Sequence, residues 1–313
     1  MAKNIFVTGA SGCIGHYVLE ELYELYSDFQ LHLLIRSPEK LNKLFREKNN
    51  ITIHQGSLDD IESFETVIKE MDIIVHIATS WLGSKNTTKI NIVKTKTLFL
   101  LANPKKLEKI IYFSTASILG KGNKPVEAAE KYGSSYVRTK YQAHAMLTEL
   151  PIKDRIITVF PTLVFGGNQQ YPKSHITSGV KSGLKYIRFL KYIYLDGSFH
   201  FLHAKDIARV VCYLMFNAHE RSEYVLGNEP VTLKDMIKSI CDTFNISQWF
   251  RLKVSIRVLQ FLAKILRIRI GPWEQHCIDN PHMVFDTVSP KDFNLEGVFP
   301  DINSVLLETK VNA

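Results

Sequence analysis

The stretch VTGASGCIG, Val7–Gly15, places Gly9, Gly12 and Gly15 three residues apart, directly after the apolar run Ile5–Val7. A glycine-rich turn between a strand and a helix lets the backbone turn tightly, approach a diphosphate and pack the helix closely on the strand. The helix then directs its free N–H groups at the phosphates. The stretch predicts a dinucleotide site at the first strand–helix junction, the alternative being a plain glycine-rich turn.

Short β-rich runs alternate with longer helical patterns through the first half of the chain. The predicted strands cover 5–8, 31–35, 51–55, 73–77, 110–114 and 156–160, and the predicted helices cover 15–25, 38–45, 63–69, 91–101 and 136–149. Such alternation implies βαβ units and a parallel sheet covered on both faces. We therefore expect an α/β fold with a doubly wound parallel sheet (a Rossmann fold) over residues 1–166. A smaller C-terminal α/β substrate lobe is expected over 167–313, with some of its segments returning to the Rossmann domain.

The composition is that of an ordinary globular protein, with 313 residues, 45% hydrophobic and 22% charged. The chain has no run of apolar residues long enough for a transmembrane helix and no signal-peptide pattern at its start. The four cysteines are scattered without metal-ligand spacing, so neither a metal site nor a disulfide framework is expected. These features favour a cytoplasmic protein.

The end of the second predicted strand bears on the choice of cofactor. An acidic residue there would bond the ribose hydroxyls of NAD, but this chain has Arg36 followed by Ser37, with Lys40 close by. A guanidinium pairs well with a 2′-phosphate. The sequence therefore favours NADP, with NAD as the alternative and a plain surface arginine as the other interpretation.

Candidate catalytic groups follow in YVRTK, Tyr136–Lys140, where the phenol and the amine share a helix face. An ammonium beside a phenol lowers the phenol pKa toward the working range, so that it can exchange a proton while a hydride moves. Thr115, at the end of the predicted strand 110–114, can donate to a substrate oxygen. Ser114 and Ser117 compete for that role, and all three hydroxyls could instead only cap the strand end.

Seven motifs in order resemble the extended short-chain dehydrogenase/reductase family, also called the NAD-dependent epimerase/dehydratase family. They are TGASGCIG, GSLDD, VHIAT, STASILG, YVRTK, FPTLVFGG and FHFLHAKDIARVV, and Asn91 heads a helix similar to another family motif. The motifs and the resemblance together give the expected cofactor-contacting residues: Gly9, Ser11, Gly12, Cys13, Ile14, Gly15, Arg36, Ser57, Leu58, Ala78, Thr79, Tyr136, Lys140, Pro161, Leu163 and Val164. The resemblance assigns catalysis to Thr115, Tyr136 and Lys140.

Departures from the family pattern bear on the substrate. Nucleotide-sugar epimerases of the family carry an arginine where this chain reads DGSFHFLH, and a second where it has Phe160. With Arg36, these losses make the chain more similar to the dihydroflavonol and cinnamoyl-CoA reductases, or to the 3β-hydroxysteroid dehydrogenases. The expected substrate-contacting residues are Trp81, Ser117, Tyr171 and His175.

The predicted function is thus NADP-dependent hydride transfer on a carbonyl or alcohol carbon of a small apolar or aromatic molecule. One alternative is an NAD-dependent epimerase or dehydratase acting on a nucleotide sugar. The other is a dinucleotide-sensing regulatory protein without turnover. A homodimer is implied by the resemblance alone.

The segment 253–269, KVSIRVLQFLAKILRIR, is basic and apolar without an acidic residue. It predicts either a buried helix of the smaller lobe or an interfacial helix on anionic lipid, which would make the protein peripheral at a membrane surface. Nucleic acid is not expected as a partner, because no recognised binding module accompanies the net charge of +8.

Overall fold

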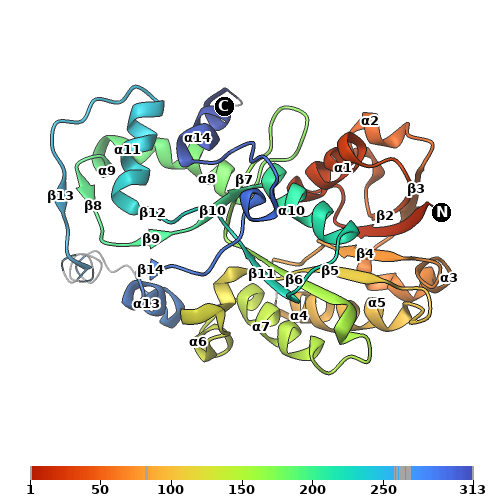
Figure 1. Ribbon diagram of the computed structural model, residues 1–313. Coiled ribbons are helices and arrows are strands. Elements are labelled where there is room, and N and C mark those ends of the chain that lie inside the picture. Colours follow the sequence, from red (N-terminus) through yellow and green to blue (C-terminus); the bar gives the residue numbers. More distant parts are fainter. Residues whose placement is uncertain are drawn as a thin grey trace.

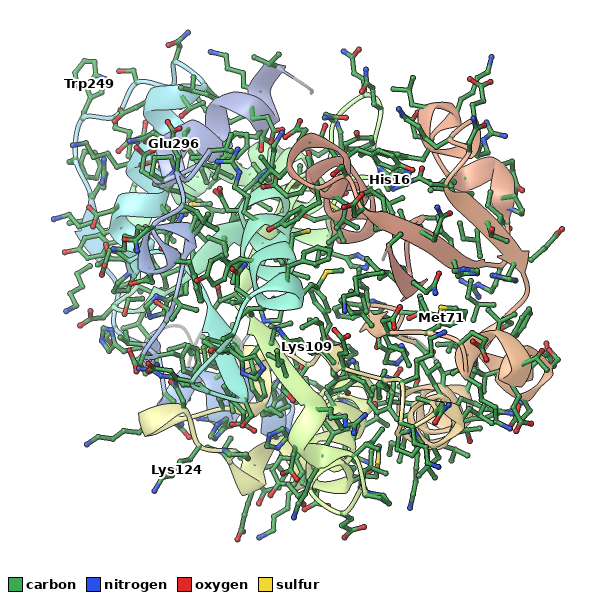
Figure 2. The ribbon with its side chains drawn as sticks, turned by 45° about the vertical axis from the view of Figure 1, so that its right-hand side comes forward. His16, Met71, Lys109, Lys124, Trp249 and Glu296 are labelled. Carbon is green, nitrogen blue, oxygen red and sulfur yellow. The ribbon has the colours of Figure 1, made fainter. Side chains whose placement is uncertain are left out.

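The computed structural model describes residues 2–81, 84–256, 258, 260, 265 and 269–311, with the backbone alone described at 84, 85, 181 and 188. Within these residues the chain forms a larger lobe built on a parallel sheet and a smaller lobe of helices and short strands (Figure 1). Figure 2 shows the side chains that fill both lobes.

The larger lobe is built on a seven-stranded sheet, counted over the described residues, in which every neighbouring pair is parallel. The strands are β1 (Lys3–Thr8), β2 (Phe29–Ile35), β3 (Ile51–Gln55), β4 (Ile73–His76), β5 (Lys109–Phe113), β6 (Ile156–Pro161) and β11 (Glu223–Leu226). Their order is β11-β6-β5-β4-β1-β2-β3, so the strand order reverses between β1 and β4. This confirms the predicted doubly wound Rossmann sheet, whose ligand crevice lies at the carboxyl ends beside that reversal.

Helices cover both faces of the sheet. One face carries α1 (Cys13–Leu25), α2 (Lys43–Arg46) and α10 (Ala204–Phe216), and the other carries α3 (Glu65–Ile68), α5 (Thr95–Leu101) and α7 (Ser135–Leu147) (Figure 1). Ile5 and Val7 of β1 pack into the first layer and Phe6 into the second, all three fully buried. Burial on both faces explains why the strands are apolar throughout. Both α10 and β11 come from beyond residue 166 and join the larger lobe.

Several connections of the larger lobe are less regular than predicted. They comprise α4 (Ser84–Thr88), α6 (Glu127–Lys131), a π-helical segment η3 (Lys89–Lys94) and the 3₁₀ turns η1 (Pro38–Lys40), η2 (Leu58–Phe64), η4 (Ala116–Ile118), η5 (Lys121–Asn123) and η6 (Lys153–Arg155). The predicted helix over 38–45 is split, because the Asn42 side chain accepts from the Leu44 N–H and starts α2 anew. The helix predicted over 91–101 begins in the π-helical η3 instead.

The smaller lobe contains the helices α8 (His175–Gly183), α9 (Ile187–Leu190), α11 (Leu233–Thr243), α13 (Pro272–Asp279) and α14 (Ile302–Val311), and the turns η7 (Leu184–Tyr186) and η8 (Pro290–Phe293). Its short strands are β7 (Leu163–Phe165), β8 (Ile193–Tyr194), β9 (Ser198–Phe199), β10 (Phe201–His203), β12 (Val231–Thr232), β13 (Leu252–Lys253) and β14 (His282–Met283). Phe165, Phe201, Val305 and Leu306 form its buried core. The lobe therefore has an apolar centre of its own.

The basic segment 253–269 is only partly described. It begins in β13, and residues 257, 259, 261–264 and 266–268 lie outside the described part of the chain. Among the described helices, none combines the length and apolar character needed to cross a bilayer.

Candidate active site

The backbone of the first loop leaves no room for a side chain at two of its three glycines. Gly9 has a φ of +80°, and a β-carbon there would lie 2.7 Å from the Ala78 amide nitrogen. A β-carbon at Gly15 would lie 2.3 Å from the Gly9 carbonyl oxygen, and the Gly12 N–H donates to that same oxygen over 3.0 Å. The loop is therefore compact because Gly9 and Gly15 carry no side chains.

The loop leads into a helix whose N-terminus is suited to a phosphate. Gly12 is the N-cap of α1, and in the described part of the chain no side chain caps it. The first-turn N–H groups of Cys13, Ile14 and Gly15 therefore remain for an outside acceptor, which a dinucleotide diphosphate would provide. Ser11 precedes them in the loop. The residues present fit a dinucleotide at this position.

The segments after β2 and β3 form the adenosine end of the predicted cofactor site. Arg36 directly follows β2 and its side chain is exposed. Ser57 caps η2, its hydroxyl accepting from the Asp59 N–H over 3.2 Å, and Leu58 is buried beneath. The Gly56 N–H donates to the Ile35 carbonyl, which holds these two segments together. A cation and a fixed turn thus flank the carboxyl ends of β2 and β3.

A buried histidine fixes the strand ends beneath the site. His76, at the end of β4, contacts the Thr8 hydroxyl through Nδ1 (2.7 Å) and the Thr95 hydroxyl through Nε2 (2.9 Å). The Thr8 hydroxyl also accepts from the Ala78 N–H. Burial, helped by the charge of Lys140, lowers the pKa of His76 to about 3, so the imidazole is neutral at physiological pH. This network holds Ala78 and the neighbouring Thr79 against the glycine loop.

Tyr136 and Thr115, predicted as partners, are brought together by the fold. Thr115 follows β5, and its hydroxyl accepts from the Ser117 N–H and donates to the Ser117 hydroxyl over 3.2 Å. Burial raises the pKa of Tyr136 to about 12, and the neighbouring Thr115 hydroxyl offsets only part of that rise. Ser114 lies next to them, and its buried hydroxyl finds no hydrogen-bond partner among the described residues. The phenol is therefore protonated at neutral pH.

The structure does not bear out the effect that the Lys140 ammonium was predicted to have on the Tyr136 pKa. Its ammonium donates to the Phe113 carbonyl oxygen over 2.6 Å and lies 4.7 Å from the centre of the Tyr112 ring. Burial lowers the pKa of this amine to about 7. The expected lowering of the Tyr136 pKa by a neighbouring ammonium is therefore wrong for this structure, because desolvation acts on both groups and favours their neutral forms.

Asn91 has a larger part in the site than its motif suggested. Its side-chain oxygen accepts from the Thr79 hydroxyl and the Ser80 N–H, and its nitrogen donates to the Ser80 carbonyl and the Thr139 hydroxyl. It sits in the π-helical η3 and is almost fully buried. Asn91 thus joins the loop after β4 to α7, which carries Tyr136. Its place in the helix motif was the one sequence signal for this role.

Trp81 lies directly on the catalytic candidate. The indole and the Tyr136 ring are stacked at 3.9 Å between centroids and 16° between planes, and the His175 ring meets the indole at 5.1 Å. Trp81 and Ser117 are exposed, as is Leu163 in β7. Three of the four predicted substrate residues, Trp81, His175 and Ser117, therefore lie near Tyr136 or its partner Thr115.

Tyr171 was predicted at the substrate site, and the structure places it elsewhere. Its ring stacks on His16 at 5.0 Å and meets Tyr17 edge-on, and its hydroxyl donates to Glu20. All three partners belong to α1. The prediction is wrong because the loop after β7 folds back over α1, where the aromatic ring is buried. His16 in turn bonds the Gly12 carbonyl and accepts from the Asn42 N–H, which ties the glycine loop to the segment after β2.

The remaining predicted cofactor residues lie where the two lobes meet. Pro161 ends β6, and Leu163 and Val164 belong to β7, which pairs with β10 of the smaller lobe. Phe160, just before them, is fully buried.

Comparison with known proteins places this geometry in a family. The model of the NAD-dependent epimerase/dehydratase family matches residues 5–227, more than half of the chain. A sterol-4-alpha-carboxylate 3-dehydrogenase of Candida albicans is 26% identical over 184 residues, covering 54% of this chain and 53% of that protein. The chain thus spans about half the length of this relative. A bifunctional dihydroflavonol 4-reductase/flavanone 4-reductase of Pyrus communis is 22% identical and is matched over 85% of each chain.

Solved structures share the whole fold. A UDP-N-acetylglucosamine 4-epimerase from Methanobrevibacter ruminantium has a TM-score of 0.69 at 18% identity, over 99% of this chain and 97% of that one. A dTDP-glucose 4,6-dehydratase from Bacillus anthracis, in complex with NAD, has a TM-score of 0.66 at 19% identity, over 98% and 95%. At these identities the likeness concerns the fold. The family match over residues 5–227 shows that the chain belongs to the NAD-dependent epimerase/dehydratase family.

Proposed function

We propose that the chain is an NADP-dependent oxidoreductase that moves a hydride between nicotinamide and a carbonyl or alcohol carbon of a small apolar or aromatic substrate. One observation carries the proposal. The Thr115 hydroxyl lies beside the Tyr136 phenol, close enough to affect its pKa, at the carboxyl edge of the sheet, and the Trp81 indole stacks on the Tyr136 ring. A proton donor, a hydroxyl partner and an aromatic surface thus meet beside the strand ends that carry the glycine loop.

Each residue of the site has its own role in the proposed hydride transfer. When bound, the nicotinamide would supply the hydride to the substrate carbon. Tyr136, a phenol at neutral pH, would give its proton to the carbonyl oxygen and regain one from solvent. Thr115 would donate to that oxygen and orient it. Lys140, held by the Phe113 carbonyl one helical turn from Tyr136, would bond the nicotinamide ribose.

The surroundings of the site support an apolar or aromatic substrate. Phe160, where related epimerases have an arginine, is buried against Val137 and Val225. Trp81 and His175 offer ring faces to a flat molecule. The names of the sterol dehydrogenase and of the dihydroflavonol reductase refer to ring-containing alcohols or ketones, which agrees with this class.

The first experiment is a titration of the purified protein with NADPH and NADH, followed by a panel of aromatic and alicyclic ketones monitored at the nicotinamide absorbance. Tyr136→Phe is expected to lower kcat/KM by about 10²- to 10⁴-fold, the usual contribution of a general acid, while NADPH binding remains. Tyr132→Phe is the matched control, because that exposed ring lies outside the site. Full activity of Tyr136→Phe would refute the assignment and favour a dinucleotide sensor.

Arg36 tests the cofactor preference. Arg36→Ala is expected to weaken NADPH binding by about 10- to 100-fold and leave NADH binding unchanged, because a charge-assisted pair with the 2′-phosphate is lost. Arg46→Ala, which removes an exposed arginine of α2, is the control. Equal affinity of the unaltered protein for both cofactors would contradict the proposal. Turnover of a UDP- or dTDP-sugar with tightly held NAD would favour the epimerase or dehydratase alternative.

A further inference from the structure

Two strongly basic segments of the sequence are joined in the smaller lobe by a pair of short strands. Residues 172–195 contain five lysines and arginines and residues 243–273 contain six, and neither segment contains an aspartate or glutamate. They pair through β8 and β13, where Ile193 is opposite Leu252 and Tyr194 is opposite Lys253. We call the surface formed by the described residues of 184–194 and 247–253, about sixty residues apart in sequence, the β8/β13 face.

The β8/β13 face also exposes large apolar side chains. Trp249 is 88% exposed and Phe189 is 76% exposed. Four further apolar residues are exposed with them: Tyr186, Leu190, Phe250 and Leu252. Soluble monomers seldom gather so many large apolar groups at one place, and such patches usually mark an interaction site.

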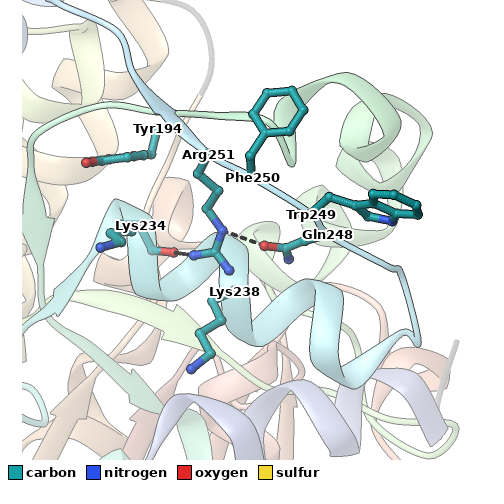
Figure 3. A pocket seen from close by; sticks show the side chains of 7 residues that line it. All are labelled: Tyr194, Lys234, Lys238, Gln248, Trp249, Phe250 and Arg251. Atoms are coloured by element: carbon teal, nitrogen blue, oxygen red, sulfur yellow. Dashed lines mark hydrogen bonds between the residues drawn. The ribbon is translucent and has the colours of Figure 1, made fainter.

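A shallow pocket of about 420 Å³ arranges the cations of this face beside its rings (Figure 3). Its lining residues are Tyr194, Lys234, Lys238, Gln248, Trp249, Phe250 and Arg251. Arg251 donates to the Gln248 side chain and to the Lys234 carbonyl, and the Lys234 ammonium lies 5.5 Å from the centre of the Tyr194 ring. Figure 3 shows Lys234 and Lys238 projecting from α11 on the Arg251 side of the connecting segment, with Phe250 on the opposite side.

Acidic groups near the face have partners of their own. Asp196 pairs with Lys253 over 2.6 Å, and Asp235 accepts from the Thr232 hydroxyl at the start of α11. Lys191 donates to the Ser247 carbonyl over 2.7 Å, which ties the two segments together. The pocket therefore keeps three lining cations, Lys234, Lys238 and Arg251, and its net charge is positive.

We propose that the β8/β13 face docks on an anionic phospholipid bilayer. Aromatic rings favour the interfacial region of a bilayer, and lysine and arginine beside them meet lipid phosphates while their alkyl chains lie along the apolar layer. A second copy of the chain would bring like charges together, which disfavours self-association through this face. Single-stranded nucleic acid would pair with the cations and rings but would leave Leu190 and Leu252 in water.

Vesicle co-sedimentation of the full chain tests the proposal. Vesicles of phosphatidylcholine with about a quarter phosphatidylglycerol are expected to bind at least about tenfold more protein than phosphatidylcholine alone, with binding lost at high salt. The double variants Trp249→Ala/Phe250→Ala and Lys234→Glu/Lys238→Glu should each reduce binding by about tenfold or more. Retained NADPH binding by both variants would show that they are folded.

The matched control is Lys121→Glu/Lys124→Glu, which reverses two exposed charges at the other end of the molecule, as the positions of Lys124 and Trp249 in Figure 2 show. This variant should bind vesicles like the unaltered protein. Equal binding by the control and by the two face variants would overturn the proposal. The proposal would also be overturned if the protein bound a single-stranded oligonucleotide but no vesicles. It would be overturned as well if the protein were a dimer in solution that became a monomer in the Trp249→Ala/Phe250→Ala variant.

Discussion

Replacing Lys140 by methionine is expected to stabilise the ligand-free protein at neutral pH while removing its activity. The amine is almost fully buried, and burial lowers its pKa from 10.5 to about 7. The unfolded chain binds more protons than the folded one between these values, so this group costs stability below pH 7 and the cost fades as the pH rises to 10.5. The lowering of the Lys140 pKa from 10.5 to about 7 corresponds to a loss of about 5 kcal/mol in the free energy of unfolding at low pH, and to a loss of about 4 kcal/mol at pH 7.

Methionine loses the hydrogen bond that Lys140 donates to the Phe113 carbonyl and the contact with the Tyr112 ring. Such losses cost about 1–2 kcal/mol. The net gain in stability at pH 7 is therefore about 2–3 kcal/mol. The two stability curves should cross between about pH 9 and 10, where the cost of the lowered pKa equals the loss of these contacts.

Urea unfolding followed by circular dichroism, repeated from about pH 7 to pH 10, measures this difference. Lys121→Met is the control, because that side chain is exposed and should change stability little at any pH. A variant less stable than the unaltered protein at pH 7 would refute the reasoning. A stability difference that does not vary with pH would also refute it, since the buried amine would then titrate like a free one.

Three other perturbations follow from the site. Burial holds the Tyr136 pKa near 12, so the phenolate that accepts a proton in alcohol oxidation becomes more abundant as the pH rises. The kcat/KM for oxidation should therefore rise from about pH 7 to 10, while the kcat/KM for carbonyl reduction, which uses the protonated phenol, stays level. A plateau of the oxidation rate near pH 7 would contradict this. Gly15→Ala should abolish NADPH binding and lower the urea concentration at the unfolding midpoint, because the added methyl would collide with the Gly9 carbonyl oxygen. The control Gly179→Ala, which has open space around the added methyl, should change neither NADPH binding nor the midpoint. Asn91→Ala should lower the free energy of unfolding in urea by about 2–4 kcal/mol and raise KM, because it removes the hydrogen bonds to Ser80 and Thr139. Replacing the exposed Asn86 by alanine should change neither quantity. Unchanged stability of Asn91→Ala would count against the bridging role of Asn91.

Local pattern was enough to predict the main architecture. The alternation of apolar runs and helical stretches gave the parallel sheet, and glycine spacing located the loop at the first strand–helix junction. The spacing of Tyr136 and Lys140 correctly placed both on α7. These features depend on chain geometry over a few residues, where conformational preferences and side-chain periodicity act directly.

The electrostatics and the environment of the site depended on contacts between distant segments. Lys140 meets the end of β5, Trp81 meets Tyr136, and Tyr171 turns back onto α1, all through the order of strands in the sheet. Desolvation of the Tyr136 phenol and the Lys140 amine follows from that packing, and it reversed the pKa shift expected for Tyr136. The sequence names the groups and their neighbours along the chain, but burial is a property of the assembled layers, and burial decides which of these groups carries charge.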